Sequence, residues 1–307
     1  MNFARWVSGA APAFDADVLS WLGHQGVSAL NVKVLPAPGL WLPCLTRRQR
    51  VNSYSRRLAE GRGLLVLPYL AGDVLLLALA ARWRTLGVAV GSDVLRRRRH
   101  GRPERLFRDA LRAFDAVWAV SNHLGAELAE AGRAPDWVAP VGVDLGELAN
   151  GAPPPPEPGR LFSPRGAAPL YRTHWIRAVS STLAGTRLVE AHHFTRGRML
   201  EEYSRAQVVI SVPESDGAPA SLMEALCCGA HVIGSGGPTV RDWLTRFGGT
   251  YGEPGEPGEL RSLVLGGLAA SAAESTEARE VRARQARAAF DRDRALHPLL
   301  QVIEQET

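Results

Sequence analysis

Two carboxylates, Asp216 and Glu224, stand eight residues apart where the sequence pattern changes from strand to loop to helix. The apolar run at residues 208–212 before them is typical of a buried strand in a parallel sheet. A polar loop with Gly217 follows, and an amphipathic segment begins at Ser221. Ionised carboxylates only accept hydrogen bonds, so this pair suits a ligand rich in hydroxyl groups. The backbone N–H groups at the start of the helix suit an anion.

The elements around these acids follow the order strand, loop, helix, strand. Cys228-Gly229 is typical of a helix end, and a second apolar run follows at residues 231–234. Such a unit places the acids at the carboxyl edge of a parallel sheet, where open α/β folds bind ligands. The alternative is a simple helix cap, with Ser221 as N-cap and Glu224 as its capping-box partner.

The segment from Glu214 to Gly234 resembles the carboxyl-terminal signature of retaining glycosyltransferases of the GT-B fold, family 4. That signature is an acid, seven residues, a Glu, and an Ala-x-x-x-Gly helix end before an apolar strand. The first acid here is Asp216, where the family more often has Glu. The resemblance implies that Glu224 binds the ribose hydroxyls of a nucleotide and that Asp216 faces the donor sugar. The other donor-binding positions that it implies are the backbone of Gly217 and Ala218 and the helix start at Ser221.

Ser163-Pro-Arg165 resembles the family segment in which a strand ends at an arginine that holds the donor diphosphate. A guanidinium can donate two parallel hydrogen bonds to phosphate oxygens. The resemblance therefore makes Arg165 the diphosphate ligand. Many relatives add a lysine nearby, and Arg172 is the candidate replacement because the second half of this chain contains no lysine. The alternative for Arg165 is a surface arginine after an edge strand.

A pair of histidines lies in the loop His192-His193-Phe-Thr195, between a predicted strand at 187–191 and a predicted helix at 199–204. The resemblance places the nucleotide base against this loop, with His193 and Thr195 among its contacts. Two histidines without a third ligand at metal spacing do not make a metal site. The family resemblance implies a metal-independent enzyme, because a helix dipole and an arginine offset the diphosphate charge. We predict no metal and no cofactor besides a donor substrate such as a UDP- or GDP-sugar.

Two loops in the first half also match the family in position. Val7-Ser-Gly9 follows the first predicted strand, at the place of the family's glycine-rich loop, although a plain turn explains it nearly as well. Gly91-Ser-Asp93 resembles a family motif after the strand at 87–90, and the resemblance implies that Asp93 orients an acceptor hydroxyl. Helix capping by Ser92 or Asp93 is the alternative.

Apolar strands alternate with helical segments on both sides of a proline-rich segment at 150–159. Four consecutive prolines favour a stiff linker. The pattern predicts an α/β chain of the GT-B type, two Rossmann-like domains with parallel sheets facing a central cleft. We expect an acceptor-side domain at 1–150, a linker at 151–159 and a nucleotide-sugar-binding domain at 160–290. A terminal helix at 291–307 should pack on the first domain, and His297-Pro298 should interrupt the helical segment 274–304.

Strands are predicted at 3–7, 29–35, 63–68, 87–90, 116–120, 137–139, 160–163, 187–191, 208–212 and 231–234.

Positive charge is concentrated in one run, Arg96-Arg-Arg-Arg99, of a chain whose net charge is +5. Such a run attracts phosphate, on an anionic membrane or on nucleic acid. We prefer a lipid-linked acceptor at a membrane surface over a DNA acceptor, because no aromatic residues are interleaved for base stacking. A solvated loop is the alternative. Without a signal-peptide pattern, a membrane-spanning run or a cysteine framework, we expect a cytoplasmic protein, peripheral at the membrane.

The reaction implied by the resemblance is sugar transfer with retention of anomeric configuration. The leaving diphosphate, held by Arg165, would help to deprotonate the acceptor on the same face of the sugar. Two other classes stay open. A GT-B sugar-nucleotide epimerase would release UDP without any acceptor. A non-catalytic nucleotide-sugar sensor or nucleic-acid-binding module would release none.

Overall fold

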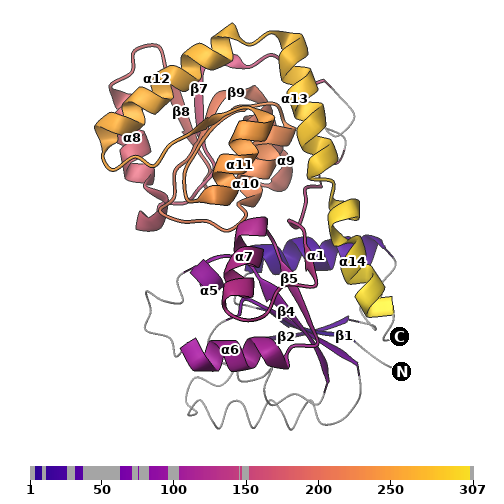
Figure 1. Ribbon diagram of the computed structural model, residues 1–307. Helices are drawn as coiled ribbons and strands as arrows, with labels where there is room; N and C mark the ends of the chain where they lie inside the picture. Colours follow the sequence, from indigo (N-terminus) through magenta and orange to yellow (C-terminus); the bar gives the residue numbers. More distant parts are fainter. Residues whose placement is uncertain are drawn as a thin grey trace. The chain divides into compact units, whose positions relative to one another are not determined.

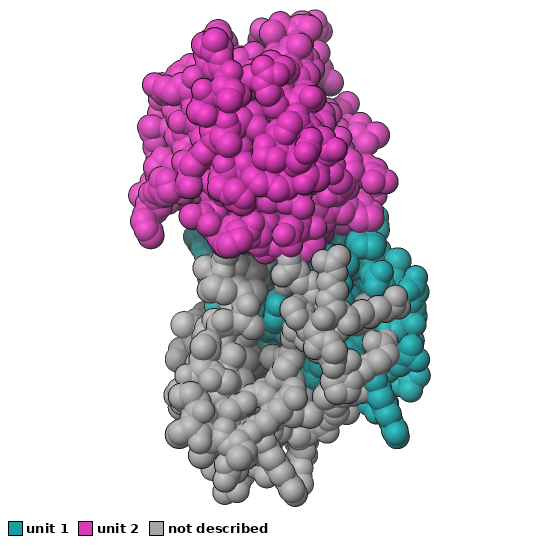
Figure 2. Space-filling model, turned by 90° about the vertical axis from the view of Figure 1, so that its left-hand side faces the viewer, with its two compact units in different colours: residues 1–141, 293–307 teal, residues 142–292 magenta. Residues whose placement is uncertain are grey.

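The computed structural model describes residues 4–8, 12–25, 32–36, 63–70, 75, 83–95, 104–144, 146 and 152–304. The chain divides into two compact units (Figure 2): unit 1 comprises residues 1–141 with 293–307, and unit 2 comprises residues 142–292. Each unit contains its own parallel sheet, which confirms the predicted α/β fold with two parallel sheets. Among the described residues, no helix is both long and apolar enough to span a bilayer.

Unit 1 is built on a six-stranded sheet with the order β2-β1-β3-β4-β5-β6, in which every pair is parallel. Strand β3 is buried along its whole length, which is why its sequence is a continuous apolar run. The strands are β1 (Ala4–Ser8), β2 (Val32–Pro36), β3 (Leu64–Pro68), β4 (Arg84–Ala89), β5 (Ala116–Ala119) and β6 (Trp137–Val138). The helices described in this unit are α1 (Pro12–His24), α5 (Ser92–Leu95), α6 (Glu104–Ala113), α7 (Asn122–Glu130) and most of α14 (Arg292–Glu304).

Unit 2 is built on a five-stranded parallel sheet with the order β11-β10-β9-β7-β8. Its strands are β7 (Glu157–Ser163), β8 (Arg187–Glu190), β9 (Ala206–Ser211), β10 (His231–Gly234) and β11 (Thr250–Tyr251). Its helices are the 3-10 turn η2 (Pro169–Tyr171), α8 (Thr173–Ser181), α9 (Arg196–Arg205), α10 (Ala220–Cys227), α11 (Pro238–Phe247), α12 (Pro257–Ala273) and α13 (Thr276–Ala289).

Both faces of the unit 2 sheet are covered by helices (Figure 1). Neighbouring residues of one strand pack into different apolar clusters, as Leu161 and Phe162 do on β7. One cluster contains side chains from α9, α10, α11 and α13, and the other contains side chains from α8 and α12. Because these clusters cover both faces, the carboxyl ends of the strands are where we expect a ligand to bind.

The strand order of unit 2 contains a switch point between β7 and β9. From β7 the chain passes to β8 on one side, and it then returns to form β9 on the other side of β7. Loops that leave the carboxyl ends of β7 and β9 therefore diverge, and open α/β sheets bind ligands in the space between such loops.

The structure differs from the sequence prediction in three features: the boundary between the units, an additional strand and an uninterrupted terminal helix. The units divide between Val141 and Gly142, ahead of the proline-rich segment, and the Pro154 carbonyl accepts a hydrogen bond from Arg279 within unit 2. Strand β11 was not predicted, because its two residues follow Gly248-Gly249 and form no apolar run. Pro298 lies inside α14 and does not interrupt it.

The terminal helices break before α14, at Phe290 and Asp291. The Phe290 carbonyl accepts a hydrogen bond from the Val143 amide (2.8 Å), and Asp291 forms a parallel bridge with Val143. A proline inside a helix costs about 3 kcal/mol. Burial of Leu296 and Leu299 on the same helix offsets this cost. At the start of α14, Asp293 accepts a hydrogen bond from the indole of Trp21 (2.6 Å), a residue of α1.

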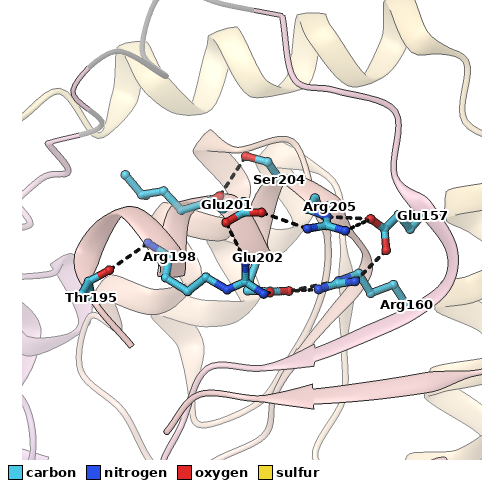
Figure 3. A network of polar contacts seen from close by, with 9 residues as sticks. Glu157, Arg160, Thr195, Arg198, Glu201, Glu202, Ser204 and Arg205 are labelled. Carbon is cyan, nitrogen blue, oxygen red and sulfur yellow. Dashed lines mark hydrogen bonds and ion pairs between the residues drawn. The ribbon is translucent and has the colours of Figure 1, made fainter. Parts of the chain in front are cut away.

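A network of ion pairs fastens α9 to β7 (Figure 3). Its centre is Glu202, which is fully buried and accepts from Arg160 Nε at 3.0 Å. Arg198 pairs with the same carboxylate from one turn earlier in α9. Around this centre, Arg205 joins Glu157 (2.6 Å) to Glu201 (2.9 Å). The network fixes the helix that follows the loop at residues 192–195.

We expect Arg160→Met to lower the free energy of unfolding of unit 2 by about 3–5 kcal/mol, because removing one partner leaves a buried carboxylate without its main counter-charge. Urea denaturation of the wild type and the variant measures the loss. Arg177→Met is the matched control, since Arg177 pairs with Glu190 at the surface and should change the free energy little. Equal effects of the two substitutions would contradict the central role of the Arg160–Glu202 pair.

Candidate functional site

Arg165 and Asp216 meet at the switch point of the unit 2 sheet. Arg165 lies just after β7, Asp216 lies in the loop after β9, and Arg165 Nη2 is 2.5 Å from Asp216 Oδ2. The Arg165 and Asp216 side chains are 19% and 20% exposed. The ion pair is therefore partly shielded from water, but a ligand can still reach it. The pair brings together the two side chains that the sequence assigns to the diphosphate and to the sugar.

Aromatic contact also orients the Arg165 guanidinium. Its carbon lies 5.0 Å from the centre of the Tyr171 ring, which η2 presents after the same loop. A planar guanidinium stacks well on an aromatic face and still donates hydrogen bonds along its edges. Arg165 is therefore held by a carboxylate and a ring, an arrangement that suits recognition of phosphate.

A third loop, after β10, lies against the loop that carries Asp216. The Asp216 amide donates to the Gly236 carbonyl (2.9 Å), and the Gly236 amide donates to Glu253 Oε1 (3.1 Å). Gly236 has a φ of +105°, and a Cβ there would approach the Asp216 nitrogen to 3.1 Å. This position therefore requires glycine for both its conformation and its close contact.

The start of α10 differs from the cap that the sequence allows. The helix begins at Ala220 with Pro219 as N-cap, and no side chain caps it. Ser221 is thus inside the first turn, and the capping-box interpretation of Ser221 and Glu224 is wrong. Gly217 and Ala218 lie in the loop that precedes this start. No side chain caps the eight-residue helix α10, so its first backbone N–H groups face the loop that precedes it. This positive end of the helix suits an anion.

Glu224 is nearly buried, and it forms an ion pair with Arg196, the first residue of α9. Arg196 Nη2 also donates to the Asp144 carbonyl (2.8 Å). Burial raises the pKa of the neighbouring Tyr203 far above its usual range, and the Glu224 carboxylate adds to this shift. Sequence reasoning missed Arg196. A cation at a helix N-terminus is disfavoured by the helix dipole, and this could have indicated a carboxylate partner outside its own helix.

The histidine loop is shaped by backbone and capping contacts. His193 adopts a left-handed conformation with φ of +54°, and its side chain is exposed. Thr195 is the N-cap of α9, and its hydroxyl accepts from the Arg198 amide at 3.3 Å. Within the described part of the chain, no three His, Cys, Asp or Glu residues are grouped as a metal site would require.

Arg172 is engaged away from Arg165. Its Nη1 donates to the Pro254 carbonyl (3.2 Å), and its guanidinium lies over the Trp175 ring at 4.9 Å. The structure therefore brings together Arg165 and Asp216 but gives Arg172 other contacts, and its role toward phosphate stays a prediction.

In unit 1, Asp93 has a structural position. Its carboxylate is fully buried and accepts hydrogen bonds from the amides of Leu70 (2.8 Å), Val90 (3.2 Å) and Gly91 (2.6 Å). Burial raises the pKa of this carboxyl above its usual range, and the amide hydrogen bonds oppose the shift. These bonds join the segment after β3 to the start of α5, and a role of Asp93 toward an acceptor stays a prediction. Gly9 and the run of four arginines at 96–99 lie outside the described residues.

Two parallel Rossmann-like units with this strand order define the GT-B class of fold, and comparison with solved structures agrees. Sucrose-phosphate synthase from Thermosynechococcus elongatus superposes with a TM-score of 0.76 at 12% identity, covering 99% of both chains. HepE from Anabaena, solved with UDP and glucose, has a TM-score of 0.67 at 13% identity and covers 99% of this chain and 100% of its own. The UDP-forming trehalose-phosphate synthase from Burkholderia vietnamiensis has a TM-score of 0.63 at 11% identity, with the same coverage.

These three structural neighbours are GT-B glycosyltransferases, and likeness at such low identity shows the fold. Neither a scan of protein-family models nor a search of curated proteins gives a match.

We expect Asp93→Ala to lower the free energy of unfolding of unit 1 by about 3 kcal/mol or more, because each buried amide left without a partner costs about 1–3 kcal/mol. Denaturation followed by fluorescence of Trp83 and Trp118, both buried in unit 1, measures this. Asp109→Ala on the exposed side of α6 is the control. An Asp93 variant as stable as this control would contradict a structural role and would favour a carboxylate that orients an acceptor hydroxyl.

Proposed function

We propose that the chain is a retaining, metal-independent glycosyltransferase of family 4, which moves a sugar from a UDP- or GDP-sugar to an acceptor. The observation that carries this proposal is the Arg165–Asp216 ion pair at the switch point of unit 2, beside the uncapped start of α10. That a fold neighbour was solved with UDP-glucose supports a nucleotide-sugar donor.

The charge of the departing diphosphate is the main electrostatic demand of this reaction. Arg165 donates to the phosphate oxygens, and the positive end of α10 adds a fixed dipole toward the same anion. Both groups are held in place before the donor arrives, so they stabilise the developing charge with little reorganisation. The leaving diphosphate then takes the proton of the acceptor hydroxyl on the same face of the sugar, and no protein base is required.

The remaining contacts fit the rest of the donor. Asp216 accepts from sugar hydroxyls, together with the backbone of Gly217 and Ala218, and Glu224 accepts from the ribose. The base lies against the loop with His193 and Thr195. Because the Thr195 side chain caps α9, this loop contributes through its backbone.

The proposal for the acceptor rests on the sequence alone. Four consecutive arginines at residues 96–99 suit a phosphate-rich support, and we propose a lipid-linked acceptor at an anionic membrane surface. A cytoplasmic enzyme that is peripheral at the membrane fits this acceptor.

A panel of nucleotide sugars tests the donor and the reaction class together. We expect release of a nucleoside diphosphate with one donor only when an acceptor is present, whereas release without an acceptor would favour the epimerase.

Glu224→Ala should weaken binding of the free nucleoside diphosphate at least about tenfold, because each lost hydrogen bond to a charged group is worth about 1.5–3 kcal/mol. Calorimetry with the nucleoside diphosphate that the panel identifies measures this. Unchanged affinity in a folded variant would remove Glu224 from the ribose site.

Arg165→Lys should lower kcat by roughly 10²-fold, because an ammonium cannot reproduce two parallel hydrogen bonds to a diphosphate. Steady-state kinetics with the donor from the panel measure the loss. Arg177→Lys at the surface is the control and should keep the wild-type rate. Equal rates for the two lysine variants would show that Arg165 does not hold the diphosphate.

A further inference from the structure

The proposed function assigns the Glu224 carboxylate to the ribose, and in the structure this carboxylate forms an ion pair with Arg196. Glu224 Oε1 is paired with Arg196 Nη1. The Glu224 side chain is 8% exposed and the Arg196 side chain is 42% exposed. The guanidinium is therefore the solvent-accessible member of the pair, and any ligand of Glu224 competes with it.

Partners outside its own helix determine the position of Arg196. As the first residue of α9 it faces the positive end of the helix dipole, which disfavours a cation. What holds it is the ion pair with Glu224 on α10 and the hydrogen bond to the Asp144 carbonyl. Arg198, two residues further along, pairs with Glu201 and Glu202 in the network of Figure 3. The two arginines of this turn thus serve different carboxylates.

We infer that Arg196 is a placeholder for the ribose: it neutralises Glu224 in the nucleotide-free chain and gives up this carboxylate when a nucleoside binds. This inference rests on the proposed function. A carboxylate offers two acceptor oxygens to a vicinal diol, and Oε1 is the one that Arg196 engages. Exchange is feasible because the Arg196 guanidinium is 42% exposed and can return to water, while hydroxyl bonds to the Glu224 carboxylate replace it. The Asp144 carbonyl retains the guanidinium beside the site after exchange.

The sign of the effect separates a placeholder from a supporting ligand. Removing a competitor strengthens nucleoside binding, whereas removing a supporting ligand weakens it. We expect Arg196→Gln to lower the Kd for uridine by about two- to fivefold, which is the range that a weak ion pair allows. Salt screens exposed ion pairs, and uridine is uncharged. Uridine should therefore bind the wild type more tightly as salt rises, and bind the Arg196→Gln variant with little dependence on salt.

The experiment is a titration of the full chain with uridine and with 2′,3′-dideoxyuridine, at low and high salt, followed by NMR. Four proteins are compared: wild type, Arg196→Gln, Arg196→Lys and Arg177→Gln. The lysine variant keeps a cation for Glu224 and should behave like the wild type. Arg177→Gln removes a surface arginine of the same unit without touching Glu224, and it should also leave the Kd for uridine unchanged. Dideoxyuridine lacks both ribose hydroxyls and should be insensitive to Arg196→Gln.

The outcomes separate this inference from the proposed function. Tighter uridine binding by Arg196→Gln alone, with loss of the salt effect, supports the placeholder. Unchanged or weaker uridine binding by that variant, with Glu224-dependent UDP binding intact in the wild type, overturns the placeholder only. A wild type that binds no nucleoside diphosphate of the donor panel, UDP and GDP included, overturns both.

Discussion

Burial of both faces of the unit 2 sheet is the constraint on which the candidate site depends. Alternate side chains of β7, β9 and β10 enter two apolar clusters, and the exposed carboxylate of β7, Glu157, lies at the amino end of that strand. Polar side chains can act only where the strands end, and the switch point makes two of these ends diverge. Arg165 and Asp216 lie there for that reason. The site is thus a consequence of how the sheet is covered and ordered.

The two site carboxylates share one property, an ion pair with an arginine. Asp216 is paired with Arg165, and Glu224 is paired with Arg196. A carboxylate with little exposure is costly when it is uncompensated, and an arginine on a neighbouring loop or helix compensates each of these two. Both pairs retain some solvent exposure, which keeps the cost of exchanging a partner small. A donor that brings hydroxyls to the carboxylates and phosphates to an arginine replaces each of these contacts with one of similar kind.

Sequence reasoning located the strands well and the local caps poorly, for physical reasons. Each of the ten predicted strands overlaps a strand of the structure, because burial on both faces produces apolar runs that are visible without context. The alternative of a cap at Ser221 was wrong because Pro219, two residues earlier, takes the N-cap position with no side-chain hydrogen bond. The pair of Arg165 with Asp216 spans 51 residues, and that of Arg196 with Glu224 spans 28. The strand order, which no local pattern encodes, determines these long-range partners.

The preference for arginine over lysine has structural consequences in unit 2. Composition alone does not assign this preference to any site. In the structure, however, several arginines of unit 2 bind two partners at once. Arg196 joins Glu224 to the Asp144 carbonyl. On α13, Arg279 donates to the carbonyls of Gly229 (2.7 Å) and Ser204 (3.0 Å), and it holds the end of α10 where Gly229 has a φ of +75°. A flexible ammonium offers a point charge, whereas a planar fork of five donors fixes the angle between two acceptors. Arginine therefore does in this unit what lysine could not, because it connects elements as well as neutralising charge.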